Sequence, residues 1–228
     1  MSTHSRTDEV WPCYLVIDVS QSMTGHRLDL GLRTVSAIVN LLRANPSVSD
    51  RCRIALLQFS ARTRMVMPLS QVTALRGMPG VSVDGGVTCV GEAFSFLRGQ
   101  LTHDVQLLMA DGFDVRRPAV LFLTDGEAGD DWEDDFVRLT EYDSYLGHGF
   151  PWYPAVVPIG IGVDDMEELR KFAFPPQRVR GFAVSSPEQA ADHVASLLEF
   201  LTSTVVPPWN PDRSVLKIAQ TFAPDDFV

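Results

Sequence analysis

Five side chains with oxygen donors occupy segments where a metal ion can bind. They are two carboxylates and three hydroxyls: Asp18, Ser20, Ser22, Thr88 and Asp125. Alternate residues of an extended chain point to the same side, so Asp18, Ser20 and Ser22 can face one point where a strand ends. Oxygen donors suit Mg²⁺, Mn²⁺ or Ca²⁺ and disfavour zinc. The pattern predicts a divalent-cation site, and Mg²⁺ is the ion that we expect first.

Short apolar runs alternate with helical patterns along the chain. Apolar runs without polar alternation are typical of strands buried on both faces of a parallel sheet, and they occupy residues 13–17, 53–59, 119–123, 155–162 and 181–184. Residues 63–69 follow the second run after a short gap, which predicts a hairpin whose edge strand tolerates Pro68. The alternation predicts an α/β fold, doubly wound, with a mostly parallel sheet, one antiparallel edge strand and helices on both faces.

Apolar residues at spacings of three and four predict the helices between these strands. The helical patterns occupy residues 28–42, 93–101, 132–141, 166–172 and 187–204. Asn45-Pro46 ends the first of them, because the residue before a proline disfavours the α region. We expect one domain over residues 12–206, preceded by a polar segment (1–11) and followed by a proline-rich tail (207–228).

Composition limits the class of function. The chain has 228 residues, of which 45% are hydrophobic and 21% charged, as in ordinary globular domains. With 19 Lys and Arg residues against 29 Asp and Glu residues, the net charge is −10, which argues against nucleic acid and anionic membranes as partners. We find no membrane-spanning run and no signal-peptide pattern, and three cysteines without metal-binding spacing fit a reducing compartment. These features predict a cytoplasmic protein.

The motifs DVSQS and TDGE, together with Thr88 in a glycine-rich loop, resemble the metal-ion-dependent adhesion site of von Willebrand factor A (VWA) domains. The resemblance extends over residues 12 to about 204. It is closer to the TerY-like bacterial proteins associated with tellurite resistance, whose recurrent phrases are similar to residues 12–23, 85–88, 117–132 and 159–164. Two departures are Gln21, where glycine is frequent, and Val87, which separates Gly86 from Thr88.

The resemblance implies a Rossmann-like fold and a cation held directly by the three hydroxyls, with the two carboxylates acting mostly through bound water. It further implies that the ion accepts a Glu or Asp carboxylate of a partner protein, which would make the chain a non-enzymatic adaptor. In TerY-like proteins the neighbouring partners are typically a PP2C-type phosphatase and a Ser/Thr kinase-like protein, encoded in bacterial metal-resistance and stress-response operons.

Two alternatives remain open at this point. A metal-dependent hydrolase or phosphatase could use the same ion, but it would need more carboxylates or a second ion, and a basic clamp for phosphate. Arg27 is the basic residue nearest to the site segments along the sequence. Alternatively, Val87 displaces Thr88, the metal site is degenerate, and the domain binds its partners through another surface.

Further acidic and aromatic residues flank the site segments. We expect Glu127 and Asp130 near the rim of the ion, and Asp111 and Asp114 at the opposite edge of the sheet. The acidic pair at 164–165 either widens the rim or caps the following helix. The aromatic segment 142–153 precedes a strand, so we place it at the end away from the metal, as a packed loop or as a second contact surface.

Overall fold

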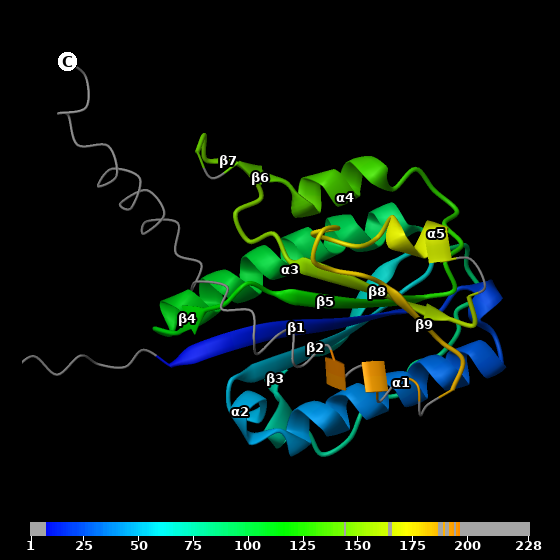
Figure 1. Cartoon of the computed structure of the whole chain (residues 1–228), viewed down its shortest axis with the longest axis horizontal. Coiled ribbons are helices and arrows are strands. Elements are labelled where there is room, and N and C mark those ends of the chain that lie inside the picture. Colours follow the sequence, from blue (N-terminus) through cyan, green and yellow to red (C-terminus); the bar gives the residue numbers. More distant parts are fainter. Residues whose placement is uncertain are drawn as a thin grey trace, which may run out of the picture.

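The computed structural model of the chain describes residues 8–143, 145–163 and 166–186, together with positions 189, 192–193 and 195–196. Most of the expected C-terminal helix, the acidic pair 164–165 and the whole tail 207–228 lie outside these described residues. Figure 1 shows a central sheet with helices on both sides.

Within the described residues, the main sheet has seven strands, six of which follow the order β3-β2-β1-β5-β8-β9. These six are β1 (Glu9–Asp18), β2 (Cys52–Phe59), β3 (Thr63–Gln71), β5 (Ala119–Thr124), β8 (Ala155–Ile161) and β9 (Phe182–Val184). The seventh, β4 (Asp114–Val115), pairs with the first residues of β1. β3 at the edge is antiparallel to β2, and the other pairs are parallel. The predicted fold class is confirmed.

Helices cover both faces of this sheet (Figure 1). α1 (His26–Ala44) and α2 (Pro46–Ser49) lie on one face, and α3 (Val90–Ala110), α4 (Glu133–Thr140) and α5 (Met166–Arg170) lie on the other. Two short 3-10 turns, Gln21–Met23 and Val72–Ala74, follow β1 and β3. No helix among the described residues combines the length and the apolar character that crossing a bilayer requires.

Alternate residues of β1 enter two separate cores. Leu15 and Ile17 belong to the buried cluster on the α1 side, whereas Tyr14 and Val16 belong to the cluster on the α3 side. Because helices cover both faces of the strand, its sequence is an almost continuous apolar run. The core on the α3 side includes Trp132, which is buried and lies with its ring centroid 4.6 Å from that of Phe172.

The ends of two elements differ from the prediction. β1 begins at Glu9, so the strand includes the last residues of the predicted polar segment 1–11, and Trp11 pairs there with Cys52. A second helix, α2, starts directly after the predicted end of α1 at Asn45. The Asn45 Oδ1 atom accepts a hydrogen bond from the backbone N–H of Ser47 at 3.1 Å, and the fixed φ of Pro46 suits a first helical residue.

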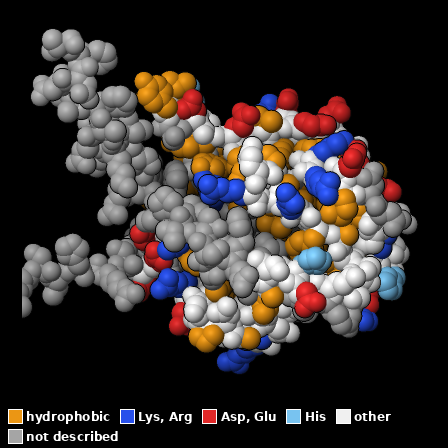
Figure 2. Space-filling view, viewed as in Figure 1, with side chains coloured by type: hydrophobic (Ala, Val, Ile, Leu, Met, Phe, Trp, Pro, Cys, Tyr) orange, Lys and Arg blue, Asp and Glu red, His pale blue; other side chains and the backbone are white. Residues whose placement is uncertain are grey.

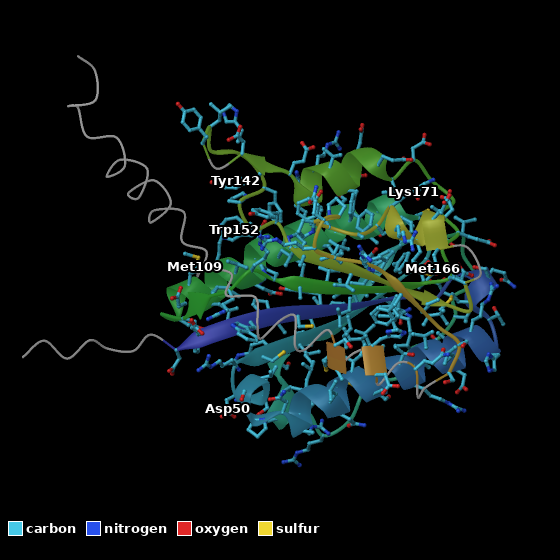
Figure 3. All side chains as sticks on the ribbon, in the orientation of Figure 1. Asp50, Met109, Tyr142, Trp152, Met166 and Lys171 are labelled. Atoms are coloured by element: carbon cyan, nitrogen blue, oxygen red, sulfur yellow. The ribbon has the colours of Figure 1, made fainter. Side chains whose placement is uncertain are left out.

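The aromatic segment 142–153 contains a small hairpin. Its strands are β6 (Tyr142–Asp143) and β7 (His148–Gly149), and the side chain of Tyr145 at the tip is 80% exposed. Tyr142 and Trp152 lie toward the end of the molecule away from Met166 (Figure 3). Since α5 lies near the carboxyl ends of the parallel strands (Figure 1), the segment occupies the end away from the predicted site, as expected.

Candidate metal site

The predicted site residues lie where the order of the strands reverses. Along the chain, β1 is followed by β2 on one side, whereas β5 on its other side is followed by β8 and β9. Doubly wound sheets bind ligands at such a switch point, outside the carboxyl ends of the strands. Asp18 is the last residue of β1, and Asp125 comes directly after β5. The topology therefore brings the two carboxylates to neighbouring strand ends.

Asp18 is fully buried, and each of its carboxylate oxygens accepts a hydrogen bond. The backbone N–H of Ser20 donates to Oδ1 at 2.9 Å, and the hydroxyl of Thr124 donates to Oδ2 at 2.9 Å. Burial raises the pKa of Asp18 from its ordinary 3.8 to about 6. The charge of Asp125 adds to this rise, whereas the hydrogen bonds from Ser20 and Thr124 oppose it. Among the ion pairs of the described residues, none compensates the charge of ionised Asp18.

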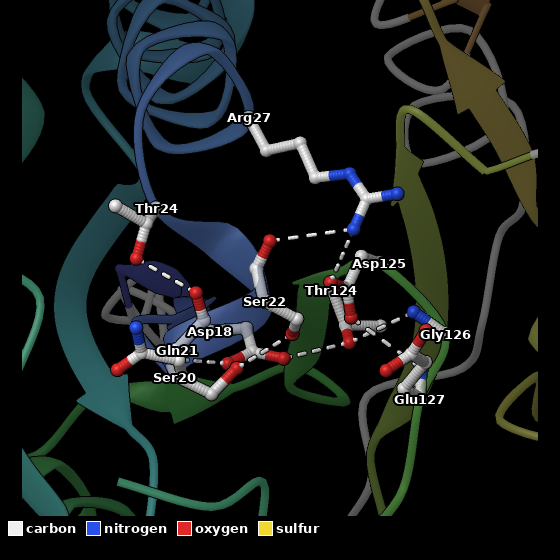
Figure 4. Close-up of polar contacts among 10 residues, drawn as sticks. All are labelled: Asp18, Ser20, Gln21, Ser22, Thr24, Arg27, Thr124, Asp125, Gly126 and Glu127. Atoms are coloured by element: carbon white, nitrogen blue, oxygen red, sulfur yellow. Dashed lines mark hydrogen bonds and ion pairs between the residues drawn. The ribbon is translucent and has the colours of Figure 1, made fainter. Parts of the chain in front are cut away.

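The two serines after β1 face one another. Their Oγ atoms are 3.1 Å apart, and Ser20 is almost fully buried. Ser20 itself is extended, but Gln21–Met23 form a 3-10 turn, so the expected extended course of the whole segment is wrong beyond Ser20. The tight turn still brings Ser22 back to Ser20 (Figure 4). Gly25 then adopts a positive φ of 77°, which lets the chain turn into α1.

Arg27, in the first turn of α1, makes an ion pair with Asp125. Its Nη1 atom lies 3.0 Å from Asp125 Oδ2 and also donates to the backbone oxygen of Ser22 at 3.3 Å (Figure 4). The Asp125 side chain has no exposed surface, whereas that of Arg27 is 41% exposed. The guanidinium thus bridges the segments after β1 and β5 from the solvent side.

Thr88 is placed by backbone hydrogen bonds that join three loops. The N–H of Gln21 donates to the oxygen of Gly86 at 3.1 Å, and the N–H of Gly129 donates to the oxygen of Thr88 at 2.8 Å. The inserted Val87 is 65% exposed, whereas Thr88 is only 7% exposed. The extra residue therefore turns into solvent, and Thr88 lies between the segments that carry Ser22 and Asp125.

The structure thus joins the predicted residues into one network. Asp18, Ser20, Ser22 and Asp125 are linked through side-chain contacts in which Thr124 and Arg27 take part, and Thr88 is tied to the network through its backbone. Sequence reasoning did not assign a role to Thr124, although its position directly before Asp125 in TDGE was a usable signal. It noted Arg27 only as a nearby basic residue.

The two acidic residues expected near the rim differ in their surroundings. Glu127 is exposed, and its backbone N–H donates to Asp125 Oδ1 at 3.4 Å. Asp130 instead accepts hydrogen bonds from the backbone N–H groups of Val90 and Gly91, at 2.8 and 2.9 Å. Asp130 therefore caps α3, and its carboxylate is engaged by backbone donors.

The donor set fits a hard divalent cation. Two buried carboxylates lie at adjacent strand ends beside two contacting hydroxyls, and Arg27 compensates the charge of only one carboxylate. No group of three or more His, Cys, Asp or Glu side chains within the described part of the chain is arranged to hold a metal. Oxygen donors such as these carboxylates and hydroxyls favour Mg²⁺, Mn²⁺ or Ca²⁺.

Comparison with protein families gives one match that spans most of the chain. The model of the von Willebrand factor type A domain matches residues 13–196. The search among curated proteins found no match.

Solved structures share the fold at low sequence identity. Proximal thread matrix protein 1 from the mussel byssus matches with a TM-score of 0.55 and 17% identity, over 85% of this chain and 48% of that one. The same protein, with a zinc-occupied MIDAS motif (metal-ion-dependent adhesion site), gives the same values. The ArnB paralog VWA2 from Sulfolobus acidocaldarius matches with a TM-score of 0.52 and 18% identity, over 82% of this chain and 44% of that one. The chain thus spans about half the length of these proteins, and the likeness shows the fold.

Proposed function

Since this chain belongs to the von Willebrand factor type A domain family, we propose that it is a protein-binding module whose docking contact is a divalent cation. Ser20, Ser22 and Thr88 hold the ion directly, and Asp18 and Asp125 act mostly through bound water. The bound ion supplies a Lewis-acidic position that accepts a carboxylate from an acidic residue of the partner protein. Mg²⁺ is the expected ion, with Mn²⁺ and Ca²⁺ as substitutes.

The observation that carries this proposal is the pair of buried carboxylates at the switch point of the sheet. Burial raises the pKa of Asp18, and the neighbouring charge of Asp125 adds to the effect. Two such groups are costly to keep ionised unless positive charge lies close to both. Arg27 contacts Asp125 but not Asp18, so a cation beside Asp18 would complete the compensation.

The finer parts of the proposal rest on the sequence. The TerY-like phrases support a role in a bacterial tellurite-resistance or stress-response system, with a PP2C-type phosphatase and a Ser/Thr kinase-like protein as partners. Three free cysteines support a cytoplasmic location, because thiols stay reduced there. We propose further that the module is not an enzyme, since the site offers no nucleophile paired with a base among its five ligands.

One contact favours the hydrolase as a second candidate. The Arg27 guanidinium reaches the site and is partly exposed, and a phosphate ester would need such a group beside the ion. Incubation of the purified protein with Mn²⁺ and a generic phosphomonoester separates the two candidates. Turnover by the wild type that disappears in Asp18→Ala would support the hydrolase. No turnover by the wild type at a protein concentration of about 10 μM would favour the adaptor.

Metal binding is tested by thermal unfolding in Mg²⁺ and in EDTA. A cation that binds the folded state alone stabilises it by about 2.7 kcal/mol at a concentration one hundred times its Kd. We expect the wild type to show such a shift, and the double variant Ser22→Ala, Asp125→Ala to show none. The exposed residue Asp131 provides the matched control, because Asp131→Asn removes one charge from the same loop but no proposed ligand. Equal unfolding temperatures in Mg²⁺ and EDTA for the wild type, over a wide range of ion concentration, would refute the proposal.

Partner binding is tested by capture from the native lysate on immobilised protein, with Mg²⁺ or EDTA. A partner retained only by the wild type and only with Mg²⁺ would establish the ion as the docking contact. A partner held equally in EDTA and by the double variant would move the function to another surface. The exposed tip of the hairpin β6–β7 would then be examined next.

A further inference from the structure

Asp130 links the loop after β5 to the start of α3. Its Oδ1 atom accepts the backbone N–H of Val90 at 2.8 Å, and its Oδ2 atom accepts that of Gly91 at 2.9 Å. The first N–H groups of a helix have no partner within the helix, and a carboxylate is favourable there. The residue at the usual capping position, Cys89, makes no side-chain cap. The cap of α3 therefore comes from a loop forty residues away.

The neighbouring glycine makes a second link to the same segment. The N–H of Gly129 donates to the backbone oxygen of Thr88 at 2.8 Å. A Cβ atom at Gly129 would lie 3.0 Å from that oxygen, and a Cβ atom at Gly91 would lie 3.1 Å from Asp130 Oδ2. The crowding atom is a backbone oxygen at Gly129 and a carboxylate oxygen at Gly91, so a larger residue at either position would push the two segments apart. Three hydrogen bonds thus hold Thr88 and the two residues Val90 and Gly91 that follow it against this loop.

The loop that makes these bonds is itself fixed at both ends. It begins at Asp125, whose buried side chain takes part in the candidate site, and it ends at Trp132, which is 8% exposed. The ring of Trp132 contacts the rings of Phe94 and Phe172 in the core, with centroids 6.1 and 4.6 Å apart. A displacement of Asp130 would therefore move Thr88 relative to Asp125.

We infer that Asp130 is a positioning residue for cation binding, which holds the segment of the proposed ligand Thr88 against the loop that begins at Asp125. This inference rests on the proposed function, because it concerns how the proposed ligand Thr88 is held. Asp130 does not touch the ion in this arrangement, since both of its oxygens are engaged by α3. Residues that orient metal ligands in this way typically change metal affinity by about 10- to 100-fold when they are substituted.

The test compares the Mg²⁺ affinity of single and double variants by titration calorimetry. We expect Asp130→Ala to weaken binding about tenfold or more. Asp131→Ala, at the exposed neighbouring position, should change it less than about twofold. The decisive measurement is made in the Thr88→Ala background, where Asp130→Ala should cause little further loss. If Asp130 served only as a structural cap, Asp130→Ala would lower stability, and any loss of Mg²⁺ affinity would be the same in the wild-type and Thr88→Ala backgrounds. That result would overturn the inference.

Asp130→Asn guards against the failure of Asp130→Ala to fold. The asparagine keeps one oxygen that can accept from α3, so its affinity should fall between those of the wild type and Asp130→Ala. Thermal unfolding in EDTA reports separately how much the cap stabilises the fold. Wild-type affinity in folded Asp130→Ala or Asp130→Asn would overturn this inference alone. A wild type that binds neither Mg²⁺ nor Mn²⁺ would refute the proposed function, and this inference with it.

Discussion

Raising the pH should destabilise the metal-free protein through Asp18. The pKa of this buried carboxyl is raised from 3.8 to about 6. The folded state therefore binds the proton more tightly than the unfolded state, so its stabilising contribution is present in acid and is lost as the pH rises through about 6. At about 1.4 kcal/mol per pKa unit, the full effect on the free energy of unfolding is about 3 kcal/mol.

About half of this effect falls in a range that is convenient to measure. For a group that titrates at about 6 when folded and 3.8 when unfolded, the loss between pH 5 and 7.5 is about 1.4 kcal/mol. The assay is urea unfolding in EDTA at both pH values, for the wild type and for Asp18→Asn. The asparagine cannot ionise, so the difference between the two proteins isolates this carboxyl from all other titrating groups. If the slope of the unfolding free energy against urea concentration is the same at both pH values, the change lies in stability and not in the compactness of the unfolded state.

A bound cation should reverse the result. It favours the ionised form of Asp18, so in saturating Mg²⁺ the free energy of unfolding should no longer fall between pH 5 and 7.5, and Mg²⁺ affinity should rise over the same range. If the wild type and Asp18→Asn show the same pH dependence in EDTA, the reasoning about uncompensated charge at the strand end is wrong.

Two further predictions concern single contacts. Replacing Arg27 by Gln removes a positive charge 3.0 Å from Asp125, which should tighten Mg²⁺ binding several-fold at low salt. The control is Arg33→Gln, further along α1. Calorimetry that shows equal or weaker Mg²⁺ binding in Arg27→Gln than in the wild type would contradict the prediction. Burial and Asp104 raise the pKa of Tyr14, whose hydroxyl donates a hydrogen bond to Asp104 at 2.8 Å. Because Tyr14→Phe leaves the Asp104 carboxylate without this donor, it should lower the free energy of unfolding by about 1–3 kcal/mol in urea titrations. Asp104→Asn in the Tyr14→Phe background should recover part of that loss.

The sequence allowed the fold and most of the candidate site to be predicted because both depend on local patterns. A strand covered on both faces must be apolar at nearly every position, as residues 13–17 are, and such a run identifies its own carboxyl end. Asp18 and Asp125 each follow such an end. Once the sheet is parallel, these ends must lie at one edge. That β1 and β5 are neighbours, which brings the two residues close together, came only from the strand order of the structure.

The contacts that could not be predicted join segments far apart in the chain. Asp130 precedes a helix, and its spacing suggested a rim residue, yet it caps a different helix forty positions away. The direction of the Arg27 side chain depends on a partner 98 positions away, and its long, half-exposed side chain has many rotamers of similar energy. No period along the sequence encodes such pairs. The 3-10 turn after Ser20 was missed for another reason, because a single turn is too short to show a period.

The charge of the surface sets a condition on how an acidic partner can dock. The chain carries a net charge of −10, and Figure 2 shows acidic side chains along the edge where α4 lies. Three of the first residues of α4, Glu133, Asp134 and Asp135, are acidic and follow the loop that carries Asp130. Such a surface attracts divalent cations but repels a carboxylate of a partner. The cation would therefore act both as the docking contact and as the positive charge that makes the approach of the partner's carboxylate favourable. Arg27 is the positive side chain that the protein itself places at the candidate site, beside Asp125.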